Sequence, residues 1–230
     1  MDKIAEHLVA ELQCETVFTI PLFGGIKVTE SVVVTWIIMG ILFLVSFIMT
    51  RNLKVDNISK RQAVIELVVT KLTSMVEGMI GEKGKGYVPY LTTILLYIGL
   101  ANIIGIFGFK PPTKDLNVTI ALALMSIVLV EAAGIYHLGV KKWLLKFTKP
   151  IAVVTPINIL ELITRPLSLC MRLFGNVLGA FVIMELIKLV VPYVVPAVFS
   201  IYFDLFDGLL QAYVFVFLTS LYIKEEIEDD

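Results

Sequence analysis

The stretch from Leu167 to Val191 reads LSLCMRLFGNVLGAFVIMELIKLVV and decides the class of fold. It is apolar and long enough to cross a bilayer core, which takes about 20 helical residues. Arg172 lies inside it, and a guanidinium keeps its proton even when it is buried. On insertion scales an arginine at mid-membrane costs about 2.5 to 3.5 kcal/mol. Arg172 therefore indicates either a functional site or a structural ion pair with an acid on a neighbouring helix.

The composition is that of a membrane protein with several spans. Of the 230 residues 58% are hydrophobic, and the mean hydropathy is +0.90. The net charge of -1 predicts no nucleic-acid partner. Cys14 and Cys170 are far apart and His7 and His137 are isolated, so we expect neither a disulfide framework nor a metal site. No glycine-rich phosphate loop occurs, and we expect no cofactor.

Apolar runs and their periodicity predict an all-α polytopic membrane protein. An external N-terminal segment covers residues 1–30, and residues 31–230 form a single integral membrane domain. We expect three spans, a surface helix and a long polar-faced hairpin, over residues 31–50, 88–109, 116–137 (spans), 58–80 (surface helix), 156–191 and 196–223 (hairpin). At about 1.5 Å per residue the first hairpin helix would measure roughly 54 Å against a core of about 30 Å. It must therefore tilt strongly or be broken.

Basic residues set the predicted orientation. They follow the first span and the third span, at Arg51, Lys54, Lys60, Arg61, Lys141, Lys142, Lys146 and Lys149. Because cytoplasmic loops carry the excess of Lys and Arg, both regions are expected inside. The N-terminus and the loop from Lys110 to Asp115 are then external, and the C-terminal tail is cytoplasmic.

One face of the first hairpin helix is polar. At about 100° per residue, Glu161, Arg165, Arg172 and Asn176 project to nearly the same side, together with Gly179. Glu161 and Arg165 are four residues apart and can neutralise each other, whereas Arg172 has no acid three or four residues away. The counter-charge of Arg172 must come from elsewhere.

The second hairpin helix carries Asp204, Asp207 and Gln211 on one face. Buried carboxylates at such spacing line a hydrated path or bind a cation. The alternative is that both acids lie close to the outer interface and are simply hydrated. We expect them to line an external path, each able to replace part of the other's function.

Two further acids have open assignments. Glu185 and Lys188 fall on the opposite face of the first hairpin helix and pair at a spacing of three, which favours a structural role. Glu131, in the third span, is either a member of an ion relay or a packed, hydrogen-bonded carboxyl.

Three motifs resemble subunit a of the F-type ATP synthases, the stator subunit that faces a rotating ring of c subunits. They are RPLSLCMRLFGN at Arg165–Asn176, LQAYVFVFLTSLY at Leu210–Tyr222 and DLNVT at Asp115–Thr119. The match runs in order from about residue 88 to the C-terminus, and the size is similar to that of bacterial members. The resemblance implies a bacterial plasma-membrane protein.

In that family two offset aqueous half-channels reach the ring from opposite membrane faces, and the arginine at the position of Arg172 separates them. The resemblance implies an ion-translocating stator subunit that is not catalytic alone. Its partners are the c-ring, the b subunits of the peripheral stalk, membrane lipid and, indirectly, the soluble catalytic sector. Predicted ion-path residues are Arg172, Asn176, Asp204, Asp207 and Gln211, of which Asp207 comes from helical spacing. Predicted supporting residues are Glu161, Arg165, Asp115, Asn117, Glu131 and Glu185.

This chain departs from the family at two positions. Many members carry Glu or His nine residues after the arginine, where this chain has Phe181, and many carry Glu or His where it has Asp204. The external acid is then Asp204 alone or with Asp207, and Glu185 contributes if the helix rotates.

Two other classes of protein were considered. A self-contained secondary transporter commonly shows inverted repeats with broken helices, and we detect no such repeat. An intramembrane enzyme would need a paired nucleophile and base or a metal-ligand set within the spans, which the sequence lacks.

Overall fold

The computed structural model describes residues 16–21, 26–51, 53–54, 58–146, 155–191 and 194–228. The predictions for His7, Cys14 and Lys149 lie outside these residues. The helices are α2 (Glu30–Thr50), α3 (Lys60–Ile80), α4 (Val88–Ile103), α5 (Leu116–Leu138), α6 (Val140–Lys146), α7 (Thr155–Val190), α8 (Val194–Ser200) and α9 (Gly208–Ile227). Shorter turns of helix are η1 (Glu82–Tyr87), η2 (Ile104–Phe107), η3 (Pro112–Lys114) and η5 (Ile201–Asp207).

The all-α prediction is confirmed apart from one small hairpin. Strands β1 (Thr16–Ile20) and β2 (Ile26–Thr29) pair antiparallel just before α2. Five helical stretches are long and apolar enough to cross a membrane, at Glu30–Thr50, Glu82–Phe107, Leu116–Leu138, Thr155–Lys188 and Val198–Ile227. These match the three predicted spans and the two members of the long hairpin.

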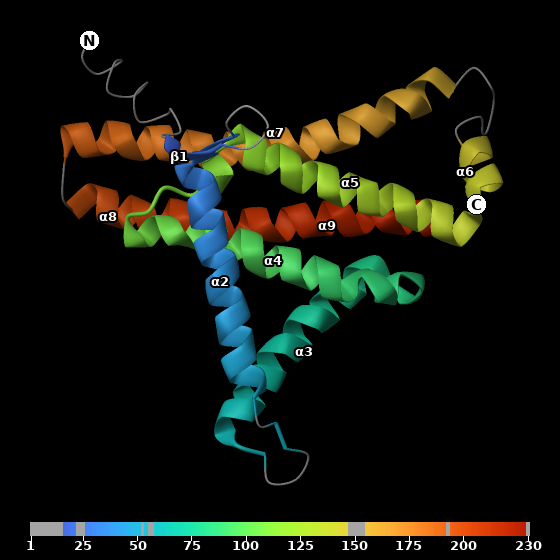
Figure 1. Ribbon diagram of the computed structural model, residues 1–230, viewed down its shortest axis with the longest axis horizontal. Coiled ribbons are helices and arrows are strands. Elements are labelled where there is room, and N and C mark those ends of the chain that lie inside the picture. The colour runs from blue at the N-terminus through green and yellow to red at the C-terminus, as the bar shows by residue number, and fades with distance from the viewer. Residues whose placement is uncertain are drawn as a thin grey trace.

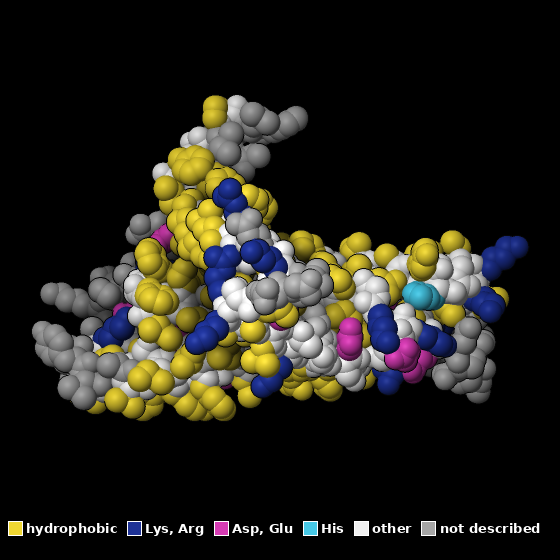
Figure 2. Space-filling view, turned by 90° about the horizontal axis from the view of Figure 1, so that it is seen from below, with side chains coloured by type: hydrophobic (Ala, Val, Ile, Leu, Met, Phe, Trp, Pro, Cys, Tyr) yellow, Lys and Arg dark blue, Asp and Glu magenta, His cyan; other side chains and the backbone are white. Residues whose placement is uncertain are grey.

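Four helices form the body of the molecule. In Figure 1, α4, α5, α7 and α9 run side by side along the long axis, and α9 contacts α4 and α5 while α5 contacts α7. Helix α2 runs across this body, and α3 leads back from the far end of α2 toward α4 and α9. Broad areas of hydrophobic side chains cover the surface seen in Figure 2, as expected of a chain surrounded by lipid.

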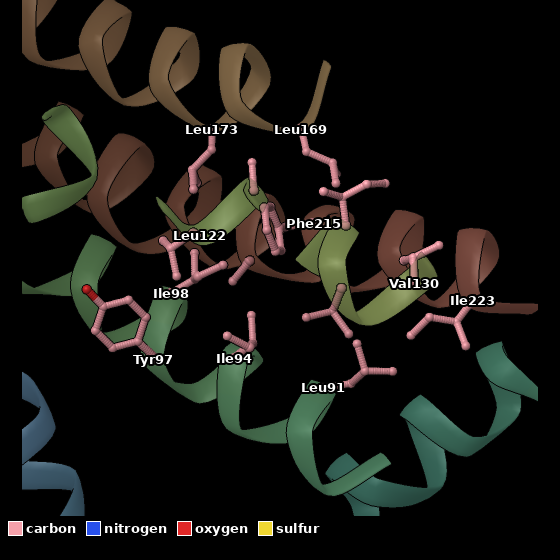
Figure 3. Close-up of a cluster of buried hydrophobic side chains, with 14 of the residues drawn as sticks. Leu91, Ile94, Tyr97, Ile98, Leu122, Val130, Leu169, Leu173, Phe215 and Ile223 are labelled. Carbon is pink, nitrogen blue, oxygen red and sulfur yellow. The ribbon is translucent and has the colours of Figure 1, made fainter. Parts of the chain in front are cut away.

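The core lies between these four helices. Figure 3 shows Leu169 and Leu173 pointing from α7 toward Leu122 of α5 and Phe215 of α9. All four side chains are buried. In a membrane the close packing of such side chains stabilises the bundle, because lipid tails are as apolar as the core itself.

Helix α7 is continuous from Thr155 to Val190 although Pro166 lies inside it. Proline has no backbone N–H to donate to the carbonyl one turn earlier, and it bends helices. The two halves of α7 in Figure 1 do not lie on one line. The helix is bent but not broken, so of the two predicted outcomes the break is excluded, and the strong tilt in a membrane stays a prediction.

The second hairpin member is helical, as predicted over 196–223. It begins at Val194, and its residues Ile201–Asp207 form a π-helix before α9 continues to Ile227. The π-helix is a feature that the sequence did not predict, because an apolar pattern does not distinguish an α turn from the wider π turn, which often occurs at functional sites.

Two sets of contacts between loops lie at opposite ends of the body. At one end Thr29 Oγ1 donates to Asp115 Oδ2 over 3.4 Å, and Lys110 Nζ lies 3.9 Å from Glu30 Oε2, so the two segments predicted to be external lie together. At the other end Lys146 Nζ lies 3.1 Å from Glu226 Oε2. The connection from α2 to α3, which is also predicted to be cytoplasmic, lies apart from both sets (Figure 1).

Candidate functional site

Arg172 points away from the core. Its neighbours Leu169 and Leu173 are buried, whereas Arg172 itself is exposed on α7. No hydrogen bond or ion pair reaches the Arg172 side chain from any residue that the structure describes. Within that part of the chain a structural ion pair does not account for Arg172, and its charge is left on the outer face of the hairpin.

Asn176 and Gln211 join the two long helices one turn from Arg172. Asn176 Nδ2 donates to Gln211 Oε1 over 2.7 Å, so the structure brings these two predicted residues together. Gln211 is only 2% exposed, and its Nε2 finds no hydrogen-bond partner among the described residues. The amide of Gln211 is thus held by one contact and has an unused donor.

A cavity of about 460 Å³ opens at the end that holds the 110–115 loop. Helix α7 forms one wall, the π-helix and the start of α9 form another, and Lys110 and Pro111 lie at its edge. Asp204, Asp207 and Gln211 all line it, as the spacing predicted.

Glu185 also lines this cavity, although the sequence placed it on the opposite face of the helix from the polar stripe. The two placements agree, because Arg172 does not line this cavity and the α7 residues that do are on the other side of the helix from it. The predicted pair is present, with Lys188 Nζ 2.7 Å from Glu185 Oε1. Glu185 is therefore paired and faces the cavity as well.

Asp204 and Asp207 differ in their contacts. Ser200 Oγ donates to Asp204 Oδ2 over 2.5 Å. A Cβ placed on Gly105 of η2 would lie 2.9 Å from Asp204 Oδ1, so the carboxyl packs closely on that turn. Asp207 is partly buried, and no described residue forms a hydrogen bond or ion pair with its side chain.

The departure at Phe181 has a structural counterpart. Lys114 is buried, and its Nζ lies 4.0 Å from the centre of the Phe181 ring. A cation over an aromatic face is attracted by the negative charge of that face. At the position where many members of the resembled family carry an acid or a histidine, this chain therefore has an aromatic ring in contact with the ammonium group of Lys114 from η3.

Asp115 and Asn117 cap a helix. Asp115 Oδ1 accepts from the backbone N–H of Asn117 over 2.9 Å and from Asn117 Nδ2 over 3.1 Å, at the start of α5. Neither residue lines the cavity described above. Their geometry is that of an N-cap, which orders the start of a helix.

A buried polar network next to the cavity was missed from the sequence. Asn102 of α4 donates from Nδ2 to the Gly208 carbonyl over 2.9 Å and accepts from Thr113 Oγ1 over 2.8 Å. Asn102 itself lines the cavity. The available signal was a single asparagine in an apolar span, since polar side chains between membrane helices commonly form such hydrogen bonds.

A second cavity, of about 450 Å³, lies at the opposite end between α7 and α9, and Ser168 is among its lining residues. Arg165 stands in its wall. The predicted pair of Arg165 with Glu161 is confirmed at 3.1 Å, but Glu225 lies at 2.8 Å and Glu226 at 3.2 Å as well. From the sequence alone, Glu225 and Glu226 are only acids of the C-terminal tail, and their contact with Arg165 is a finding of the structure.

Glu131 accepts a hydrogen bond from Trp143 Nε1 over 3.0 Å. It lines neither of the two cavities. Of the two readings left open, the structure favours the packed, hydrogen-bonded carboxyl.

Comparison with known proteins agrees with the motifs. Residues 32–224 match the family model described as ATP synthase A chain. The chain is 34% identical over 200 residues to ATP synthase subunit a 1 of Crocosphaera subtropica, covering 86% of each chain. It is 35% identical over 201 residues to ATP synthase subunit a of Moorella thermoacetica, covering 87% of this chain and 91% of that protein. The chain therefore belongs to the ATP synthase A chain family and is a membrane component of an ATP synthase.

Proposed function

We propose that this subunit conducts the coupling ion past a ring of c subunits, with Arg172 facing the ring. The observation that carries this proposal is an exposed arginine without a described hydrogen-bond or ion-pair partner, placed along α7 between two cavities that are each lined in part by polar side chains. Ser168, one turn before Arg172, lines one cavity. Asn176, one turn after it, bonds to Gln211, which lines the other.

The physical chemistry of this arrangement suits ion transfer to and from a rotor carboxylate. A fixed guanidinium favours the ionised form of an acid that comes close to it. The ion then leaves the rotor toward one cavity and is replaced from the other. The same positive charge repels a free cation, so ions cannot pass directly from one cavity to the other.

The orientation and partners are part of the proposal. Lysines and arginines after the first and third spans place the end with α6 in the cytoplasm and the end with β1 and β2 outside. The cavity with Asp204 is then the external half-channel. Peripheral-stalk b subunits, lipid and, indirectly, the soluble catalytic sector complete the surroundings in a bacterial plasma membrane. Membership in this family argues against the alternative function, a self-contained secondary transporter.

The test is Arg172→Ala in the intact complex. Inverted membrane vesicles are assayed for ATP-driven ion pumping, normalised to the amount of assembled complex. We expect pumping to be abolished with assembly largely intact, because Arg172 lies outside the core and forms no hydrogen bond or ion pair with the described residues. Met171→Ala, at the neighbouring exposed position, is the control and should keep pumping. Substantial pumping by an assembled Arg172→Ala complex would overturn the proposal.

A further inference from the structure

Three carboxylates share the external cavity, but they are not equally free to exchange an ion. Asp204, Asp207 and Glu185 all line it. A carboxylate that already holds a donor or a cation must give up that contact each time it takes an ion and must restore it afterwards. The contacts of the three acids therefore distinguish an acid that can exchange the coupling ion from acids that hold the structure of the cavity.

Asp204 has structural contacts on both oxygens. Oδ2 accepts from Ser200, one turn earlier, and Oδ1 packs against Gly105 on η2. The bond from Ser200 is local, whereas the packing on Gly105 joins the π-helix to η2 at the end of α4, a contact between elements that are far apart in the sequence. Asp204 thus positions the wall of the cavity.

Glu185 is neutralised by its neighbour. Lys188 lies 2.7 Å from it, and the pair has no net charge. A cation entering the cavity meets a carboxylate that already has its counter-ion. Glu185 and Lys188 therefore contribute little attraction for a second cation.

The Asp207 side chain has no hydrogen bond or ion pair with any of the described residues. It is partly buried, lines the cavity and lies one helical turn before Gln211. Gln211 is buried and bonded to Asn176, so of the two aspartates Asp207 is the one next to the pair of amides that leads toward Arg172. Residues four apart on a helix are neighbours on its surface, so an ion at Asp207 is next to the Gln211 amide.

We propose that Asp207 is the carboxylate that exchanges the coupling ion in the external cavity, and that Asp204 is a positioning residue. The proposal rests on the function proposed above. If the ion is a proton, Asp207 takes it from cavity water and later yields it to the ionised rotor carboxylate. Asp207 then ends each cycle ionised, as it began.

The experiment compares single variants in the intact complex by ATP-driven pumping per assembled complex. Asp207→Asn removes the titratable group and keeps the size, and we expect pumping to fall about tenfold or more, as for the loss of a proton-transfer group. Asp207→Glu should recover a large part of it. Asp204→Asn retains an oxygen that accepts from Ser200, and pumping should stay within about threefold of wild type. Glu185→Gln should behave like Asp204→Asn.

A second readout tests the positioning role. Asp204→Leu cannot accept from Ser200, and it should lower the amount of assembled complex, whereas Asp207→Leu should lower pumping at normal abundance. The proposal is overturned if Asp204→Asn impairs pumping more than Asp207→Asn does. It is also overturned if Asp207→Asn pumps at the wild-type rate.

The triple variant Glu185→Gln, Asp204→Asn, Asp207→Asn separates this inference from the proposed function. If the triple variant fails to pump while Asp207→Asn alone pumps normally, the cavity conducts and only the assignment of Asp207 falls. If the triple variant pumps at the wild-type rate, the cavity is not the ion path, and both proposals fail.

Discussion

At the scale of single residues, the two arginines of α7 have opposite surroundings. Arg165 contacts three carboxylates, from Glu161, Glu225 and Glu226, and its guanidinium lies 5.1 Å from the ring centre of Tyr222. Arg172 forms no hydrogen bond or ion pair with any of the described residues. The same residue type on one helix therefore serves structure at one position and is available to a partner at the other.

Arg172→Lys should abolish pumping almost as completely as Arg172→Ala. A lysine ammonium is a compact point charge without the planar fork, and it loses its proton more readily when it is desolvated. The measurement is pumping per assembled complex in inverted vesicles. Normal pumping with lysine would show that any positive charge suffices at this position.

Arg165→Lys should act mainly on stability. The sequence alone suggested a partly replaceable residue with one acidic partner, but an ammonium cannot hold three carboxylates with the geometry of a fork. We expect a loss of about 1 to 3 kcal/mol, the scale of hydrogen bonds to charged groups. Thermal melting of the detergent-solubilised complex measures it, with pumping recorded beside it.

The control for Arg165 is Lys85→Ala, which breaks an exposed pair with Glu82 of similar length, 2.7 Å. Exposed pairs contribute little, so the melting temperature should hardly change. If Arg165→Lys left melting unchanged and still stopped pumping, Arg165 would belong to the ion path.

At the scale of elements, α4 and α9 approach each other closely beside the cavity that holds Asp204. A Cβ on Gly208 would lie 2.8 Å from Asn102 Cβ, and the Gly208 carbonyl accepts from Asn102 Nδ2. A glycine at this point lets the two backbones approach, as small residues commonly do between membrane helices. The contact also fixes the end of the π-helix that precedes Gly208.

Gly208→Ala should therefore push α9 away from α4 and weaken the hydrogen bond from Asn102. Overpacking of this kind typically costs about 1 to 3 kcal/mol. Thermal melting and the amount of assembled complex are the measurements. Gly40→Ala in α2 is the matched control, since its new Cβ would meet nothing within 4 Å. Equal melting of the two variants would contradict the close contact.

At the scale of the whole molecule, the β1–β2 hairpin with the 110–115 loop and α6 with the end of α9 form two groups at opposite ends, and this separation allows a sharper topology experiment. Thr113, in the loop predicted to be external, is fully buried and bonded to Asn102, so a cysteine there would be a poor probe. Lys27 of β2 and Lys142 of α6 are both exposed and lie in the two different groups.

Single cysteines at Lys27 and Lys142 are introduced into a background in which Cys14 and Cys170 are replaced by alanine. Intact cells are treated with a membrane-impermeant thiol reagent. We expect labelling at position 27 and not at position 142, with both labelled after the cells are opened. Labelling of position 142 alone in intact cells would reverse the orientation.

The sequence by itself determined the membrane class, the five apolar stretches and the polar stripe around Arg172. These follow from composition and from a helical period, which are local properties of the chain. Spacing also gave the Glu161–Arg165 and Glu185–Lys188 pairs, because partners three or four residues apart meet on any helix. The same logic placed Asp204, Asp207 and Gln211 on one side.

The tertiary structure decided which of these charged and polar side chains have a hydrogen-bond or ion-pair partner among the described residues. The contacts of Arg165 with Glu225 and Glu226, of Asp204 with Gly105 and of Asn102 with Gly208 join segments that are distant in sequence. Such contacts depend on how helices pack, and no period within one helix encodes them. The π-helix at Ile201–Asp207 and the position of Glu185 in the cavity wall also depend on the packed structure. Only the packed molecule therefore distinguishes Asp207 from its two neighbouring acids.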